Sequence, residues 1–288
     1  MATDASAHRL AVLGAGVMGT GIAAMALGHG VPVTLIDIDE SKLDDAESRI
    51  GHQLRHARLM GALPSGRAVE ALTTSSSLGA AATATAVIEA VTELPGPKAE
   101  ALAGASAAVR PGTPIISNTS GIPIDEMAGW TARPDELAGT HFMNPPYLIA
   151  TVEVIRGPRT AQTAMARIAD LLAALERRAI VVRDRPGFVT SRLLHPMIND
   201  AARIVGESTA TAQDVDALMQ GCLGHPTGPL RTADLIGIDN LVDALNALYE
   251  RTGDERAKPC EQLLEKVASG HLGRKTGRGF YEYREAMA

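Results

Sequence analysis

The sequence lacks the features that mark several classes of protein. Its 288 residues include only two cysteines, Cys222 and Cys260, which are too few and too isolated for a disulfide framework or a cysteine-rich zinc site. We therefore assign these thiols no chemistry. The basic residues form no tract and the formal net charge is −6, so the chain has no electrostatic footprint for nucleic acid.

Long apolar runs are also missing. None approaches the roughly 20 residues that a membrane-spanning helix needs, and the opening MATDASAHRL does not resemble a signal peptide. We expect a cytoplasmic protein without membrane association. His52 and His56 have the spacing of two ligands on one helix face, but Gln53 stands where zinc proteases carry glutamate and no third ligand is near. We predict no metal site.

The composition is otherwise that of a globular protein, with 45% hydrophobic and 21% charged residues. Up to residue 185, strand and helix patterns alternate, which predicts an α/β fold of the Rossmann type with a doubly wound, mostly parallel sheet. We expect an antiparallel exception at the Pro145-Pro146 hairpin. The predicted strands cover residues 10–13, 31–37, 86–91, 113–120, 138–142, 151–155 and 179–184. The predicted helices cover 98–109, 124–128 and 161–175, with a helix pair over 41–72 that breaks at residues 64–66.

Strand patterns stop at RDRPGF, where proline and glycine mark a domain boundary. We place a first domain at residues 1–185 and a smaller, all-helical domain at 186–288. Its apolar residues at helical spacing predict amphipathic helices over 191–205, 212–223, 232–252 and 259–269. So much apolar surface in a small domain suggests that the domain forms a homodimer.

The first fifty residues have the pattern of a dinucleotide-binding unit. Glycines in G-x-G-x-x-G spacing follow a short apolar strand and open an Ala-rich helix, an arrangement that suits a pyrophosphate at the helix N-terminus. Asp37 ends the next strand, where a carboxylate accepts hydrogen bonds from the ribose of NAD and repels the 2′-phosphate of NADP. Flavin enzymes use a similar turn, although no second flavin signature is present. The predicted NAD-binding residues of this unit are Gly14, Gly16, Val17, Met18, Gly19 and Asp37.

The whole chain resembles the L-3-hydroxyacyl-CoA dehydrogenase family. Seven stretches carry the resemblance in colinear order: GAGVMGTGIA, EAVTE, SNTS, HFMNPP...VEVI, DRPGFVTSRLL, GHPTGPL...ADLIGID and GRKTGRGFYEY. The resemblance implies an NAD-dependent oxidoreductase that oxidises the 3-hydroxyl group of a short 3-hydroxyacyl thioester, similar to 3-hydroxybutyryl-CoA, by hydride transfer.

The resemblance also implies roles for individual residues. His141 corresponds to the general base and Glu153 to the carboxylate that orients it; imidazole suits proton removal from an alcohol near neutral pH. Ser120 corresponds to a serine that contacts substrate, and Asn144 to an asparagine beside the nicotinamide and His141. Further residues that correspond to positions lining the cofactor site are Glu93, Lys98 and Lys275.

Two departures from the family pattern bear on the substrate. Ser191 stands where the family usually has a substrate-contacting asparagine, and Met60 and Ala62 stand where relatives often have lysines that meet CoA phosphates. Three alternatives therefore stay open. The substrate is either a small hydroxyacyl group, such as glyceryl, on an acyl carrier protein in polyketide extender-unit synthesis, or a free hydroxy acid; or the protein binds NAD without catalysis.

Overall fold

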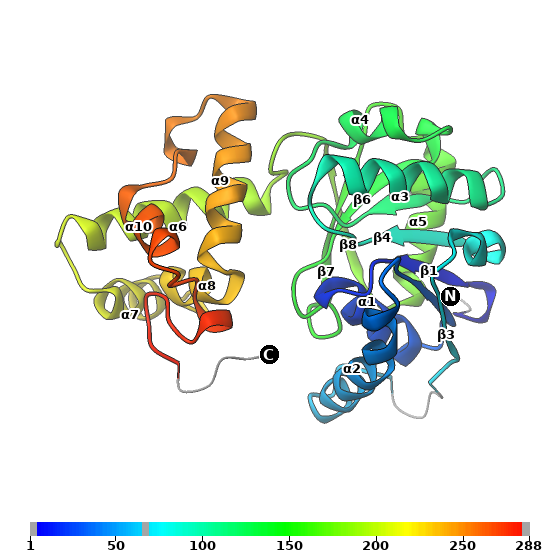
Figure 1. Ribbon diagram of the computed structural model, residues 1–288, viewed down its shortest axis with the longest axis horizontal. Coiled ribbons are helices and arrows are strands. Elements are labelled where there is room, and N and C mark those ends of the chain that lie inside the picture. Colours follow the sequence, from blue (N-terminus) through cyan, green and yellow to red (C-terminus); the bar gives the residue numbers. More distant parts are fainter. Residues whose placement is uncertain (1–4, 65–68, 284–288) are drawn as a thin grey trace. The chain divides into compact units, whose positions relative to one another are not determined.

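The computed structural model describes residues 5–64 and 69–283 and divides into two compact units, Met1–Arg185 and Pro186–Ala288 (Figure 1). Each unit has its own buried core. No helix in the described part of the chain is long and apolar enough to cross a membrane.

The Met1–Arg185 unit contains an eight-stranded sheet in the order β3-β2-β1-β4-β5-β6-β7-β8. Neighbouring strands are parallel from β3 to β6, β6 and β7 are antiparallel, and β7 and β8 run in the same direction. These pairings confirm the predicted doubly wound sheet and its hairpin exception. The strands are β1 (Leu10–Leu13), β2 (Val33–Ile36), β3 (Leu72–Ser75), β4 (Ala86–Glu89), β5 (Ile115–Ser117), β6 (Leu137–His141), β7 (Thr151–Arg156) and β8 (Arg178–Arg183).

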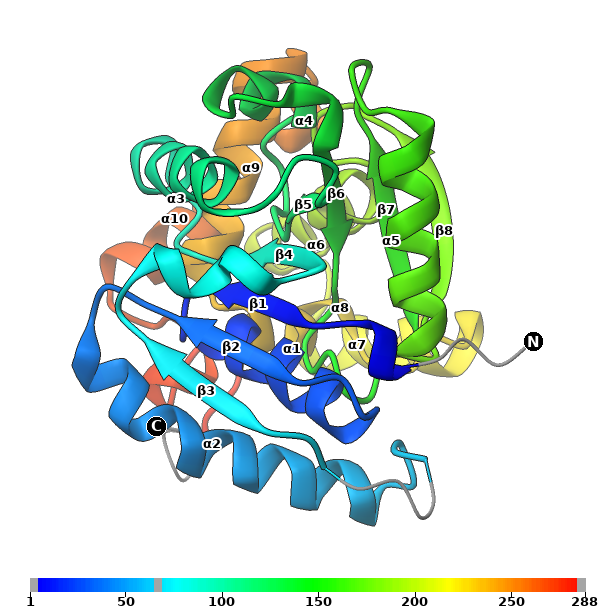
Figure 2. The same cartoon turned by 90° about the vertical axis from the view of Figure 1, so that its right-hand side faces the viewer.

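Helices cover both faces of this sheet, as Figures 1 and 2 show with α3 and α4 on one side and α2 on the other. The α-helices of the unit are α1 (Val17–Gly28), α2 (Glu40–Leu59), α3 (Pro95–Ala108), α4 (Ile124–Met127) and α5 (Gln162–Ala174). Short 3-10 helices are η1 (Ala5–Ala7), η2 (Leu78–Thr83), η3 (Ala128–Trp130) and η4 (Pro134–Glu136).

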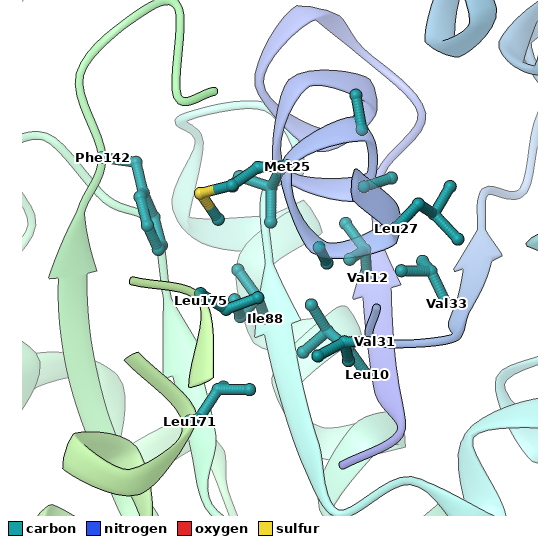
Figure 3. Close-up of a cluster of buried hydrophobic side chains, with 14 of the residues drawn as sticks. Leu10, Val12, Met25, Leu27, Val31, Val33, Ile88, Phe142, Leu171 and Leu175 are labelled. Atoms are coloured by element: carbon teal, nitrogen blue, oxygen red, sulfur yellow. The ribbon is translucent and has the colours of Figure 1, made fainter. Parts of the chain in front are cut away.

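Alternate residues of the central strands divide between the two faces, as the two-residue period of a strand requires. Leu10 and Val12 of β1 belong to a large core cluster that also takes in buried residues of α1, α2 and α5, whereas their neighbours Ala11 and Leu13 are buried outside that cluster. Figure 3 shows the centre of this cluster, where Met25 of α1 lies near Phe142 and Leu175. Because helices cover both faces of the sheet, side chains that are open to a ligand are expected at the ends of its strands.

The helix pair predicted for residues 41–72 is wrong in its second half. A single helix, α2, ends at Leu59, the described residues 60–64 and 69–71 are not helical, and Leu72 begins β3. Part of the predicted break at residues 64–66 lies in 65–68, outside the described residues. The strand β3 has the sequence LTTS, with Leu72 as its one apolar residue, and lies at the edge of the sheet. Its pairing with β2 therefore decides its conformation.

The Pro186–Ala288 unit is helical in its described residues, as predicted. Its α-helices are α6 (Thr190–Gly206), α7 (Ala212–Leu223), α8 (Pro229–Ile236), α9 (Ile238–Thr252) and α10 (Glu261–Ala268), with 3-10 helices η5 (Glu255–Ala257) and η6 (Arg274–Thr276). The single helix predicted over 232–252 is broken into α8 and α9. Gly237 lies between them with φ +96°, a backbone conformation that glycine adopts without strain.

Two buried aspartates tie the end of this unit to its helices. Asp234 of α8, 1% exposed, accepts hydrogen bonds from the backbone N–H groups of Phe280 and Tyr281 (2.8 and 2.9 Å) and from the Tyr283 hydroxyl (3.0 Å). Asp216 of α7 accepts from two N–H groups at the start of α8 and from the Tyr281 hydroxyl at 2.7 Å. We call this arrangement the aspartate clasp: Asp216, Asp234 and residues 280–283.

Candidate active site

Three glycines at the junction of β1 and α1 have two different physical tasks. A Cβ on Gly14, whose φ is +101°, would lie 2.6 Å from the carbonyl oxygen of Ala90, and a Cβ on Gly19 would lie 1.7 Å from that of Gly14. These two positions therefore permit close backbone packing. A Cβ on Gly16, by contrast, would meet nothing within 4 Å. The space beside Gly16, at the N-terminus of α1, suits a phosphate group.

Asp37 follows β2 and reaches back to the glycine loop. Its carboxylate accepts a hydrogen bond from the backbone N–H of Ala15 at 2.7 Å and another from that of Asp39 at 2.9 Å. The half-buried Asp37 side chain is thus held beside the glycine loop, where a dinucleotide would bind. Val17 and Met18, at the start of α1, are exposed and half-buried. This set of glycines, helix N-terminus and acid fits an NAD molecule.

A buried lysine of α3, Lys98, has two carboxylate partners, one of which, Glu89, ends β4. The ammonium Nζ of Lys98, whose side chain is 1% exposed, is 2.8 Å from Glu89 and 3.0 Å from Glu93. Glu89 also accepts a 2.5 Å hydrogen bond from the Ser117 hydroxyl. Because burial of an unpaired charge is costly, each member of this cluster depends on the others.

Glu93 is the member of this cluster that reaches the surface, with 42% of its side chain exposed. Its Oε1 accepts hydrogen bonds from the Thr119 hydroxyl at 2.5 Å and the backbone N–H of Ser120 at 2.9 Å. Burial by itself would raise the pKa of Glu93, but the Lys98 ammonium and these hydrogen bonds lower it below its ordinary value. Glu93 is therefore an ionised group that fixes the loop carrying Ser120.

His141 and Glu153 lie directly opposite each other in the antiparallel ladder of β6 and β7. The imidazole Nδ1 is 3.2 Å from a carboxylate oxygen of Glu153, and both residues are buried, at 7% and 6% exposure. Nδ1 thus faces the carboxylate, which favours the tautomer that carries a proton on Nδ1. The lone pair of the neutral ring then lies on Nε2, which can accept a proton.

The predicted residues of this unit follow the ends of neighbouring strands. Gly14 follows β1, Asp37 follows β2, Glu93 follows β4 and Ser120 follows β5, while Asn144 comes shortly after His141 at the end of β6. These strands are parallel neighbours, so the residues share the carboxyl edge of the sheet. The strand order switches between β1 and β4: β2 and β3 lie on one side of β1, and β4 and the later strands lie on the other. Ligands bind at such a switch point in doubly wound folds.

Two predicted residues belong to the other unit. Ser191 is buried in α6 at 5% exposure, and Lys275 in η6 makes an ion pair with Asp239 at 2.6 Å.

Several residues that shape the edge were missed by the sequence prediction. Glu89 pairs with Lys98, and Asn118 accepts a hydrogen bond from the backbone N–H of Phe142 at 3.0 Å, so that it joins the loop after β5 to the hairpin of His141. Thr119 bonds to Glu93 and to the backbone N–H of Ile122. Their signal is that each carries a polar side chain at or just after the end of an apolar strand.

Two family models together cover almost all of the chain. Residues 9–185 match the model described as 3-hydroxyacyl-CoA dehydrogenase, NAD binding domain, and residues 187–283 match the model described as 3-hydroxyacyl-CoA dehydrogenase, C-terminal domain.

Relatives and solved structures agree with these matches. The chain is 36% identical over 280 residues to a probable 3-hydroxybutyryl-CoA dehydrogenase of Bacillus subtilis, covering 96% of this chain and 98% of that protein. Among solved structures, FadB2 of M. tuberculosis aligns with TM-score 0.91 and 36% identity, and (S)-3-hydroxybutyryl-CoA dehydrogenase PaaH1 of Ralstonia eutropha with 0.88 and 35%; each alignment covers 96% of this chain and 99% of the other.

Proposed function

Because the chain belongs to the 3-hydroxyacyl-CoA dehydrogenase family of NAD-dependent oxidoreductases, we propose that it oxidises the 3-hydroxyl group of a short 3-hydroxyacyl thioester, such as 3-hydroxybutyryl-CoA. The observation that carries this proposal is the buried pair of His141 and Glu153, 3.2 Å apart at the catalytic edge of an NAD-binding sheet. The names of the similar proteins support the same substrate class.

In the proposed mechanism, His141 removes the hydroxyl proton of the substrate through Nε2. Glu153 holds the ring through Nδ1, and its negative charge lies 3.2 Å from the ring on which positive charge forms during the reaction. When bound, NAD supplies the acceptor for the hydride that leaves the carbinol carbon. The proton and the hydride thus leave the substrate for different acceptors, and the proton goes to His141.

We assign the remaining residues of the edge to binding and orientation. Ser120, which is exposed on the loop held by Glu93, would bond to the reacting oxygen through its hydroxyl, and the exposed Asn144 would lie beside the nicotinamide. Glu93 would meet the cofactor with its exposed side. Lys98 is too deeply buried to share that surface, so its part is to keep Glu93 charged and in place.

The decisive test is the variant His141→Ala. We expect its turnover of 3-hydroxybutyryl-CoA to fall by roughly 1,000-fold or more, because a general base and its share of transition-state stabilisation are lost, while NADH binding followed by fluorescence stays close to that of the wild type. His52→Ala, which removes an exposed imidazole from α2, is the matched control. Retained turnover in His141→Ala would overturn the assignment.

A second candidate substrate is a small hydroxyacyl group on an acyl carrier protein. The observation that favours it is the apolar surface at the end of α2, where Leu59 is 85% and Met60 62% exposed at the place expected to meet CoA phosphates. Ser191, shorter than asparagine, also fits a small polar acyl group. Initial rates of NADH formation with 3-hydroxybutyryl-CoA, a glyceryl-loaded carrier protein and free hydroxy acids, compared side by side, separate these substrates.

The same comparison tests a third possibility, that the protein binds NAD without catalysis. Against this possibility stands the survival of the complete set of predicted catalytic side chains, with His141 and Glu153 in bonding distance. NADH binding without turnover of any of the three substrates would favour the silent binder.

We further propose that the helical unit forms a homodimer. A groove of about 550 Å³ along α6 is lined mainly by apolar residues, among them Val189 and Leu193, which are 48% and 69% exposed. Burial of such surface against a second copy would remove it from water. Analytical ultracentrifugation should find a dimer at micromolar concentration and a monomer for Leu193→Glu. A monomeric wild type would refute this proposal.

A further inference from the structure

Arg177 is a buried cation whose hydrogen bonds all go to neutral acceptors. It lies between α5 and β8 and is 8% exposed. Its Nε donates to the carbonyl oxygen of Leu175 at 2.8 Å, and its Nη1 donates to those of Pro146 and Ile149 at 3.4 and 3.3 Å. Burial lowers the pKa of Arg177, against the opposing effect of the nearby Glu176 charge. The cation therefore takes its stabilisation from backbone carbonyls.

The fourth partner of Arg177 is the ring of His29. Its Nδ1 is 2.8 Å from the carbonyl oxygen of Met25, and a carbonyl can only accept, so Nδ1 carries the proton. Nε2 then accepts a hydrogen bond from Nη2 of Arg177 at 3.1 Å. His29 is the C-terminal cap of α1, the helix that begins at the glycine loop. Arg177 is thereby bonded to the end of the nucleotide-binding helix as well as to the loop after His141.

The loop of residues 142–150 is held from two other directions. Pro146 packs so closely on α1 that a Cβ on Gly21 would lie 2.9 Å from it, and the hydroxyl of Tyr147 is 3.2 Å from Nδ1 of His56 on α2. Below the loop, Met25, Phe142 and Leu175 lie in one apolar cluster (Figure 3). Asn144 lies at the exposed start of this loop. It is the loop residue that the proposed function places beside the nicotinamide.

Stability by itself does not account for an arginine here. A buried charge loses its hydration, and replacing buried ionic groups by well-packed apolar ones is often neutral or stabilising. What the guanidinium supplies, and an apolar side chain cannot, is a rigid fork of donors that bonds two loop carbonyls and a ring on α1 at once.

We propose that Arg177 is a positioning residue for the dehydrogenase reaction, which holds loop 142–150 to α1 and so keeps Asn144 in place beside His141. This inference rests on the proposed function for its effect on turnover. The hold on the loop itself does not depend on that function. Loss of Arg177 should lower kcat and leave the KM for NAD nearly unchanged, since the glycine loop and Asp37 keep their own contacts.

The test compares Arg177→Met, Arg177→Lys and the control Arg178→Met, which removes the exposed arginine next in the chain. For Arg177→Met we expect kcat to fall roughly 10- to 100-fold, because small misplacements of a catalytic group are that costly, with the KM for NAD within about twofold. Arg177→Lys should recover part of the loss, because an ammonium group can bond to one loop carbonyl. It also serves if Arg177→Met does not fold.

Hydrogen exchange of the unliganded protein reads the loop without any turnover. The amides of Leu148 and Ile149 bond to the carbonyl oxygen of Pro145 at 3.0 and 3.3 Å and should exchange faster in Arg177→Met than in the wild type or in Arg178→Met. Unchanged exchange, or a kcat equal to that of the control, would overturn the proposal. Absence of wild-type turnover would refute the proposed function instead, and the exchange rates would still decide whether Arg177 holds the loop.

Discussion

A carboxylate at the sheet edge of the Met1–Arg185 unit and a carboxylate in the helical Pro186–Ala288 unit both bond to their own chain but differ in exposure. Asp234 of the helical unit is 1% exposed and accepts three hydrogen bonds from residues 280–283 of its own chain. Glu93 at the sheet edge also bonds to its own chain, yet 42% of its side chain remains on the surface. The first arrangement closes a fold, and the second leaves a charged group available to a ligand.

This difference teaches how to separate a site from a structural polar cluster. Each group of the aspartate clasp contributes to the stability of the helical unit, because buried acceptors without partners are costly. At the sheet edge, Glu93, Ser120 and Asn144 each keep an exposed part, and the hydrogen bond from the backbone N–H of Ser120 holds Glu93 in place. Burial and hydrogen bonding alone therefore do not separate the two kinds of carboxylate; what distinguishes Glu93 is that the chain holds it in place and still leaves part of it exposed.

The largest effect on stability that we expect comes from Asp234→Asn. The amide group would place a donor against donors of residues 280–283, so the free energy of unfolding should fall by roughly 2–4 kcal/mol, as for hydrogen bonds to a buried charge. Urea denaturation followed by circular dichroism measures this loss. Asp243→Asn, at an exposed position of the neighbouring helix α9, is a control that should change stability little. A stable Asp234→Asn variant would contradict the structural role of the clasp.

Glu153→Gln should give the opposite result, with activity lost and stability kept. Glutamine can still accept the hydrogen bond from Nδ1 of His141, but it lacks the charge that stabilises the imidazolium, so kcat should fall on the order of 100-fold. The midpoint of urea unfolding should stay near that of the wild type. Equal losses in kcat and in folded protein would instead place Glu153 with the structural carboxylates.

Alkaline pH should weaken the aspartate clasp. Burial, the Asp234 charge and the hydrogen bond to Asp234 raise the pKa of Tyr283 to about 12, above its ordinary value of 10.0. A raised pKa in the folded state adds stability that is fully present below pH 10 and is lost as the pH rises through about 12. The urea midpoint should therefore fall over this range. Tyr283→Phe, which cannot ionise at this position, should show a shallower fall; an equal slope would refute the prediction.

The smallest effect concerns Glu176, an exposed carboxylate with φ +54°. Glycine adopts this left-handed conformation without strain but costs more entropy on folding, so Glu176→Gly should stabilise the protein by roughly 0.5 kcal/mol. Glu176→Gln is the control, because it removes the same charge near Arg177 and keeps the strained backbone. A lower unfolding midpoint in the glycine variant than in the glutamine variant would contradict this prediction.

Strong periodicity let the sequence predict most of the fold. The apolar strands of the parallel sheet, the hairpin of His141 and Glu153 and the helical second unit are all present. β3 was missed because its pairing with β2, a contact distant in sequence, decides the conformation of LTTS. The break between α8 and α9 was missed because the apolar period continues across Gly237, while the positive φ is a backbone property.

The candidate site was predictable where a local pattern carries the chemistry, as at Gly14 and Asp37, or where the family resemblance supplied it. The roles of Glu89, Asn118 and Arg177 depend on partners 9 to 148 residues away in the chain, and no local pattern shows such contacts. A buried polar residue reveals its part only once its neighbours in space are known.

The aspartate clasp also bears on how the protein is made. The groups that bond to Asp234 lie 46 to 49 residues later in the chain, and the Tyr281 hydroxyl lies 65 residues after Asp216. A ribosome makes the Met1–Arg185 unit first and residues 280–283 after every helix of the second unit. During translation the first unit is therefore free to fold early, whereas Asp234 of the second waits for all three of these partners and Asp216 for the Tyr281 hydroxyl. A nascent chain stalled before residue 280 would leave Asp234 without these hydrogen bonds.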